Sequence, residues 1–188
     1  MPSALIYGHS QSGGMGLDLD KALRKRGWKV SRTTRVGWND GKLLANLDDV
    51  EAEAAAASRV YLYGGGNSDK PSVKQLRELV QALGPSKTVL ILPPVNLDRD
   101  ADDVAAQRAK NKGNADGLAD LVPVFQLEAA GSNFWPDKIH MRPGSPTSLA
   151  AAEQLVQPLE PSAGGAAPFL VAAVLGVAAL LVVRRARG

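Results

Sequence analysis

The sequence of 188 residues contains no cysteine and only two histidines, His9 and His140. The missing thiols exclude a cysteine nucleophile, a disulfide framework and a cysteine-ligated zinc site. Imidazole chemistry, such as general base catalysis, is confined to two positions. The aspartates Asp40, Asp69 and Asp98 do not have a recognisable spacing of metal ligands. We therefore expect no metal ion and no cofactor.

The main part of the chain also lacks an excess of charge. The formal net charge is +3, and three arginines within the last five residues, Arg184, Arg185 and Arg187, account for all of it. A nucleic-acid-binding domain carries a basic patch or stripe. We expect no nucleic-acid partner, and the length suits one ordinary domain. The sequence carries no signal for an oligomeric state.

Charged residues are absent from residues 161–183, and residues 168–183 are almost wholly apolar. A membrane-spanning helix needs about 20 apolar residues, within a range of roughly 17 to 25. A buried core helix is the alternative, but prolines and glycines separate this run from the rest. We therefore expect a domain over 1–157, a linker over 158–167, a transmembrane helix over 168–183 and a basic tail over 184–188.

A single-pass C-terminal anchor in a lipid bilayer leaves the side of the domain open. The positive-inside tendency keeps the terminal arginines in the cytoplasm and places the domain outside. Residues 1–7 have no basic region and no long apolar core, so we expect no signal peptide, and export then lacks a route. The sequence does not decide between a domain outside the membrane and a domain in the cytoplasm.

Apolar β-rich runs alternate with amphipathic stretches within residues 1–157, which is typical of a parallel sheet covered by helices. We expect strands at residues 4–7, 28–36, 59–63, 88–92 and 121–127. We expect helices at residues 17–26, 50–57, 73–83, 101–110 and 145–156. The prediction is an α/β fold: a flavodoxin-like three-layer α/β/α sandwich with a five-stranded parallel sheet, followed by the transmembrane helix.

Candidate polar groups follow four of these strands. Ser10 follows the first, residues 37–40 the second, Asn67 the third, and Asp137 and His140 the fifth. Loops at the carboxyl ends of parallel strands converge on one edge of the sheet, where ligands bind. A serine with a histidine and a carboxylate is what nucleophilic acyl chemistry requires. The sequence therefore predicts a hydrolase site at this edge.

The motifs around these residues resemble those of the SGNH hydrolases, the GDSL-type esterases and lipases, over roughly residues 4–155. The segment Gly-His-Ser-Gln-Ser at residues 8–12 is similar to the nucleophile block. Gly37 is similar to the glycine of the second block, and Gly-Gly-Asn at residues 65–67 matches the third. Asp-Lys-Ile-His at residues 137–140 matches the terminal block, the most specific of the four by its spacing.

The resemblance implies a role for each matched residue. Ser10 is the expected nucleophile and His140 the base that removes its proton, because imidazole titrates near neutral pH. Asp137 is expected to orient the imidazole and stabilise its charged form. The expected oxyanion hole consists of the backbone N–H groups of Ser10 and Gly37 and the side-chain amide of Asn67.

Three positions depart from the family pattern: His9 stands in place of the usual aspartate, Gln11 in place of leucine, and Ser68 where aspartate often follows. Neighbouring side chains on an extended segment point to opposite faces, so we interpret His9 as structural rather than catalytic. The departures keep a second hypothesis open, an inactive SGNH-like binding domain tethered to a membrane.

Two other interpretations of the glycine-rich segment at residues 8–16 are weaker. A phosphate-binding loop at a helix start is one, but the lysine of a P-loop and the G-x-G-x-x-G spacing are missing. The G-x-S-x-G elbow also fails, because Ser12 stands at its last glycine.

The leading prediction is thus a membrane-anchored serine esterase acting on a small-molecule or glycan ester, either an acylated carbohydrate or a lipid. Trp38, Phe134 and Trp135 flank the expected site.

Overall fold

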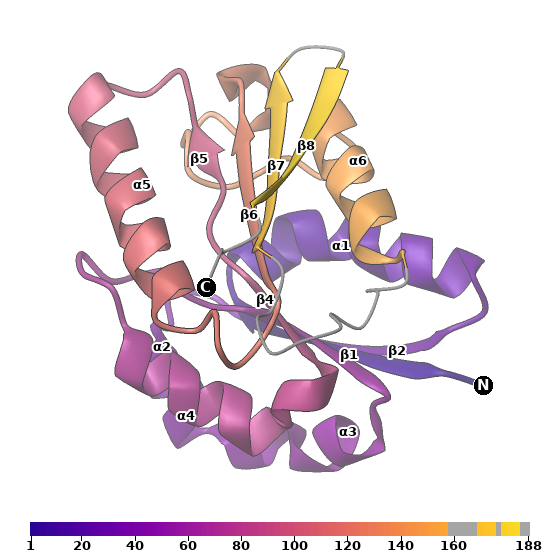
Figure 1. Ribbon diagram of the computed structural model, residues 1–188. Coiled ribbons are helices and arrows are strands. Elements are labelled where there is room, and N and C mark those ends of the chain that lie inside the picture. Colours follow the sequence, from indigo (N-terminus) through magenta and orange to yellow (C-terminus); the bar gives the residue numbers. More distant parts are fainter. Residues whose placement is uncertain (158–168, 176–177, 185–188) are drawn as a thin grey trace.

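A computed structural model describes residues 1–157, 169–175 and 178–184, and its first six strands form a parallel sheet (Figure 1). These strands are β1 (Ser3–His9), β2 (Lys29–Arg35), β3 (Arg59–Tyr63), β4 (Thr88–Ile91), β5 (Val95–Asn96) and β6 (Val124–Ala129). Their order is β2-β1-β3-β4-β6, with β5 paired beside β6. This is a doubly wound order that reverses between β1 and β3. The α/β prediction and its five strands are confirmed, and β5 adds a sixth.

Helices cover both faces of the sheet. They are α1 (Gln11–Lys25), α2 (Asp40–Ala45), α3 (Glu51–Ala56), α4 (Val73–Leu83), α5 (Ala101–Asp116) and α6 (Pro146–Leu155), with short 3-10 turns at Leu47–Val50, Pro85–Lys87 and Gly131–Asn133. Helices α1 and α6 pack on one face, and α2, α3, α4 and α5 contribute to the core on the other (Figure 1). The strands are apolar on both faces because both faces are buried. Successive residues of β1, such as Leu5 and Ile6, belong to the cores on opposite faces of the sheet.

Helix α1 begins at Gln11, six residues before the expected start at residue 17. Its first turns contain Gly13, Gly14 and Gly16, which favour a loop when only local propensity is considered. A Cβ atom on Gly14 would lie 2.4 Å from the Met141 carbonyl oxygen. The glycine thus permits close contact between α1 and the segment after β6, and tertiary packing overrides propensity.

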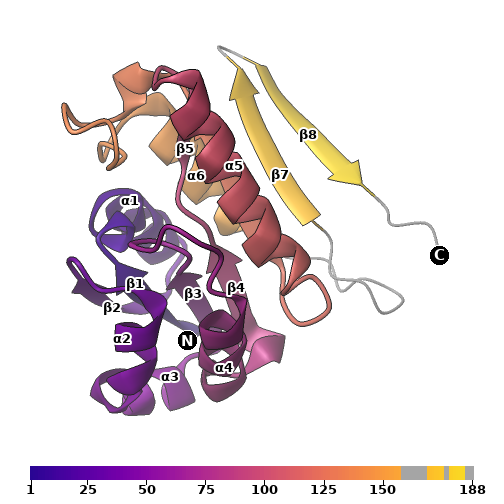
Figure 2. The same ribbon diagram turned by 90° about the vertical axis from the view of Figure 1, so that its left-hand side faces the viewer.

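The C-terminal part of the chain differs from the prediction. Residues 169–175 and 178–184 form two strands, β7 (Phe169–Leu175) and β8 (Ala178–Arg184), not the expected transmembrane helix over 168–183. Strand β7 lies parallel to β6 and pairs antiparallel with β8 at the edge of the sheet (Figure 2). An apolar run that no polar residue interrupts fits a buried helix or buried strands equally well, and here its first part, β7, pairs with β6.

None of the helices in the described residues has the length and hydropathy that crossing a membrane requires. The expected linker over residues 158–167 and all but the first residue of the expected tail lie outside the described residues. Attachment to a membrane therefore stays a prediction from the sequence.

Candidate active site

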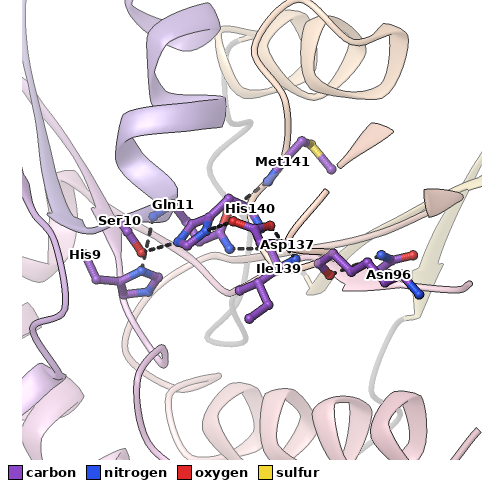
Figure 3. Close-up of polar contacts among 9 residues, drawn as sticks. His9, Ser10, Gln11, Asn96, Asp137, Ile139, His140 and Met141 are labelled. Atoms are coloured by element: carbon purple, nitrogen blue, oxygen red, sulfur yellow. Dashed lines mark hydrogen bonds and ion pairs between the residues drawn. The ribbon is translucent and has the colours of Figure 1, made fainter. Parts of the chain in front are cut away.

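Ser10 lies between β1 and α1, at the carboxyl edge of the sheet and at the first turn of the helix. Its Oγ lies 2.7 Å from Nε2 of His140, which comes from the loop after β6 (Figure 3). The backbone before it is tightly packed, because a Cβ atom on Gly8, at φ +151°, would lie 2.3 Å from the Tyr63 carbonyl oxygen. The pairing of Gly8 with Tyr63 at this short distance fixes the end of β1 against β3, and with it the position of Ser10.

Asp137 organises the loop that carries His140. Its Oδ2 lies 2.7 Å from Nδ1 of His140, and its Oδ1 accepts the backbone N–H groups of Ile139 at 2.9 Å and His140 at 3.0 Å. Partial burial alone would raise the pKa of Asp137, but these hydrogen bonds from His140 and Ile139 outweigh it and lower the pKa. Asp137 therefore remains ionised at neutral pH.

The hydrogen-bond chain fixes the tautomer of His140. An ionised carboxylate can only accept a hydrogen bond, so Nδ1 of His140 carries the proton and donates a hydrogen bond to Asp137. Nε2 is then free to accept the hydroxyl proton of Ser10. The structure thus brings together three of the predicted residues, Ser10, Asp137 and His140, in an arrangement that can deprotonate a serine hydroxyl.

The two other predicted residues, Gly37 and Asn67, lie on adjoining loops. Gly37 follows β2 with φ +76°, and Asn67 follows β3 with φ +51°. The side-chain Nδ2 of Asn67 donates to the carbonyl of Trp38, the neighbour of Gly37, at 2.7 Å. Hydrogen bonds join neither residue to Ser10 in the part of the chain that the structure describes. An amide nitrogen has two N–H bonds, so the hydrogen bond to Trp38 uses only one of those of Asn67.

Asp40 supports the loop after β3, a role that its position in the sequence does not indicate. It is buried at the start of α2, and its carboxylate accepts the Gly65 N–H at 3.0 and 3.1 Å and the hydroxyl of Ser72. Burial raises the pKa of Asp40, while Ser72, Gly65 and the charge of Lys110 oppose the rise. Asp40 therefore holds the loop that presents Asn67.

His9 packs against the same loop. Its side chain is buried, its Nδ1 accepts the Gln11 N–H at 3.4 Å, and a Cβ atom on Gly66 would lie 2.5 Å from its Nε2. Burial lowers the pKa of His9 to about 4, and the charges of Lys110 and His140 act in the same direction. The ring is therefore neutral at neutral pH and fills the space that a side chain on Gly66 would need.

Comparisons with known proteins find similarity in structure but not in sequence families. No protein-family model and no curated protein sequence matches the chain. Among solved structures, it is similar to the C-terminal catalytic domain of the peptidoglycan O-acetyltransferase A of Streptococcus pneumoniae, with TM-score 0.53, 17% identity, and coverage of 81% of this chain and 86% of that one.

Two esterases are also similar in structure. A carbohydrate esterase of family 3 from Talaromyces cellulolyticus matches with TM-score 0.58, and an acetyl esterase variant with an acetate ion matches with TM-score 0.56. Each is 12% identical, and each match covers 82% of this chain and 94% of the other. At these identities the matches show a shared fold, and it is the α/β fold that the sequence resemblance implied.

We predict a loss of stability in acid that depends on His9. Between pH 6.5 and 4 the unfolded chain binds a proton at His9 and the folded protein does not. The free energy of unfolding should fall as the pH falls through this window, with a contribution from His9 on the order of 3 kcal/mol. Urea denaturation of wild type and His9→Gln across the window measures the difference.

The matched control is Asn46→Ala, which removes an exposed amide at the end of α2, leaves both histidines in place and should keep the wild-type slope. An identical loss of stability in wild type and His9→Gln would show that His9 is not buried in its neutral form.

Proposed function

We propose that the protein is a serine esterase that cleaves carboxylic esters through an acyl-enzyme intermediate. The observation that carries the proposal is the chain of two 2.7 Å contacts from Ser10 Oγ through the His140 ring to Asp137. The fold similarity to esterases and to an O-acetyltransferase domain supports it. An inactive binding domain, the alternative from the sequence, does not need Ser10 and His140 within hydrogen-bond reach.

The proposed reaction has two steps with the same base. In the first, His140 Nε2 takes the Ser10 proton as Oγ attacks the ester carbonyl carbon, and then returns it to the leaving alcohol as the ester bond breaks. In the second, His140 deprotonates a water that attacks the acyl-serine, and the carboxylic acid leaves with Ser10 restored. Asp137 stabilises the positive charge that His140 carries between the proton transfers.

The negative charge that develops on the carbonyl oxygen needs hydrogen-bond donors. We assign this role to the backbone N–H groups of Ser10 and Gly37 and to the side chain of Asn67. The hydrogen bond from Asn67 to Trp38 and the support of Gly65 by Asp40 hold the two loops in place. Donors that are fixed before the reaction avoid the cost of reorganisation during it.

The proposed substrate is a carbohydrate that carries a small acyl group. Of the three aromatic residues near the site, Phe134 is buried in the core on one face of the sheet, Trp38 is partly buried against the core on the other face, and Trp135 is 47% exposed. An open groove of about 650 Å³ lies beside the catalytic loop and includes Trp135, Lys138 and Arg142. An exposed indole with cationic neighbours suits the apolar face and hydroxyl groups of a sugar.

We predict that Ser10→Ala abolishes ester hydrolysis, because no other group in the proposed mechanism forms the acyl intermediate. The kcat for p-nitrophenyl acetate should fall by about 1,000-fold or more. Ser86→Ala, in the turn before β4, is the matched control and should keep wild-type kcat. Equal turnover by Ser10→Ala and wild type would refute the proposed nucleophile, and absence of turnover by wild type would favour the inactive binding domain.

Asn67→Ala removes one donor to the oxyanion and leaves the catalytic triad intact. We expect kcat to fall by about 100- to 1,000-fold with a much smaller change in KM, because the hydrogen bond forms mainly in the transition state. Asn46→Ala, which removes an exposed amide at the end of α2, should have wild-type kinetics. A kcat of Asn67→Ala close to that of wild type would exclude Asn67 from the oxyanion hole.

Acyl transfer to an alcohol is a second candidate function, supported by the similarity to an O-acetyltransferase domain. An alcohol can attack the acyl-serine in place of water with the same base, so the two functions differ only in the acceptor. Turnover of p-nitrophenyl acetate in the presence of a methyl glycoside distinguishes them. An esterase releases acetate alone, whereas acetylated glycoside in excess of acetate, detected by mass spectrometry, would identify a transferase.

A further inference from the structure

The backbone of the loop that carries His140 is held by hydrogen bonds on every side. Within the loop, the Lys138 N–H donates to the Trp135 carbonyl at 2.9 Å, and the Trp135 N–H donates to the His140 carbonyl at 2.8 Å. Asp137 Oδ1 accepts the N–H groups of Ile139 and His140. These contacts leave the carbonyls of Lys138 and Ile139 and the N–H of Met141 to find partners outside the loop.

Gln11 supplies partners to two of these three groups. Its Nε2 donates to the Ile139 carbonyl at 2.7 Å, and its Oε1 accepts the Met141 N–H at 3.4 Å, so one amide brackets His140 on both sides (Figure 3). The side chain is 4% exposed. A flipped amide would direct oxygen at a carbonyl and N–H at an N–H, so the pairing fixes the amide orientation.

Asn96, the last residue of β5, supplies the remaining partner. Its Nδ2 donates to the Lys138 carbonyl at 3.1 Å, and its Oδ1 accepts the Asp98 N–H at 3.0 Å. Lys138 has φ +57°, a backbone conformation that is unfavourable for residues other than glycine. A buried amide on its carbonyl therefore stabilises the most strained point of the loop.

Packing of the side chains alone cannot fix the position of His140. The side chain of His140 is 34% exposed and that of Asp137 is 45% exposed, so solvent replaces much of the contact that would immobilise a buried ring. The backbone must then define where the ring lies. Gln11 is the residue directly after Ser10, so its amide ties the nucleophile segment to the base through a path separate from the Ser10–His140 hydrogen bond.

We propose that Gln11 is a positioning residue for His140, with Asn96 supporting it at Lys138. The inference rests on the proposed esterase function, since it concerns the geometry between Ser10 and its base. Gln11 acts through the backbone on either side of His140 and does not touch the substrate. Leucine, an apolar side chain of similar size, can fill the same space but leaves the Ile139 carbonyl and the Met141 N–H without their partners.

Gln11→Leu tests this role by comparison with a control that loses a similar bond elsewhere. We expect kcat for p-nitrophenyl acetate to fall by about 10- to 100-fold with KM within about twofold, because small displacements of a catalytic group have effects of this size. Thr88→Val removes a buried hydroxyl that donates to the Gly84 carbonyl at the opposite edge of the sheet. It should lower the melting temperature and keep wild-type kcat.

Gln11→Glu adds a signature that a merely structural residue would not give. Its carboxylate still accepts the Met141 N–H but repels the Ile139 carbonyl, and its negative charge near His140 favours the protonated imidazole. The acid limb of the kcat/KM profile should therefore move to higher pH by about half a pH unit or more. This variant also carries the test if Gln11→Leu does not fold.

Wild-type kcat in Gln11→Leu, or an unshifted acid limb in Gln11→Glu, would overturn the positioning role. Inactivity of the wild type would instead refute the esterase proposal, and proton exchange then tests the geometry without turnover. The His140 Nδ1 proton, observed by NMR, should exchange faster in Gln11→Leu than in wild type and in Thr88→Val. Equal exchange rates in all three would overturn the inference independently of any activity.

Discussion

The contact between Ser10 Oγ and His140 Nε2 joins residues 130 positions apart in the sequence, and the proposed chemistry depends on it. The parallel sheet makes the contact possible because it directs the segments that follow β1 and β6 to the same edge. Three other polar side chains of this edge act on His140 or on the loop that carries it. Asp137 orients the imidazole, and Gln11 and Asn96 hold the backbone that carries it.

Each departure from the SGNH motif has a structural counterpart at this edge. His9 is buried against Gly66, and Gln11 spans the backbone around His140. The hydroxyl of Ser68 donates to the Lys70 carbonyl at 2.8 Å, and the Ser68 carbonyl accepts a hydrogen bond from the Lys110 ammonium group at 2.9 Å. Burial lowers the pKa of Lys110, with Asp40 and Asp69 opposing the effect. The three residues thus contribute to the packing of the site, and their presence does not require the loss of the hydrogen-bond chain.

The sequence predicted those parts of the molecule that have a local pattern. Five strands follow from β-rich apolar runs, and the triad follows from motif spacing. Strand β5, with two residues, is too short to give a periodic signal, and helix α2 has six residues, as α3 does, but lacks its run of alanines. Helix α1 and the C-terminal strands depend on tertiary contacts that override or complement local preference. Asp40, Asn96 and the bonds of Gln11 are likewise long-range contacts, which spacing along the chain does not encode.

The most direct test of the central claim is to locate the residue that becomes a covalent nucleophile. The full chain is treated with a fluorophosphonate, digested, and mapped by mass spectrometry, with His140→Gln as the comparison. The account predicts one adduct, on Ser10, which forms much more slowly in His140→Gln because the hydroxyl has lost its base. An adduct on another residue, or labelling of Ser10 at an equal rate without His140, would contradict it.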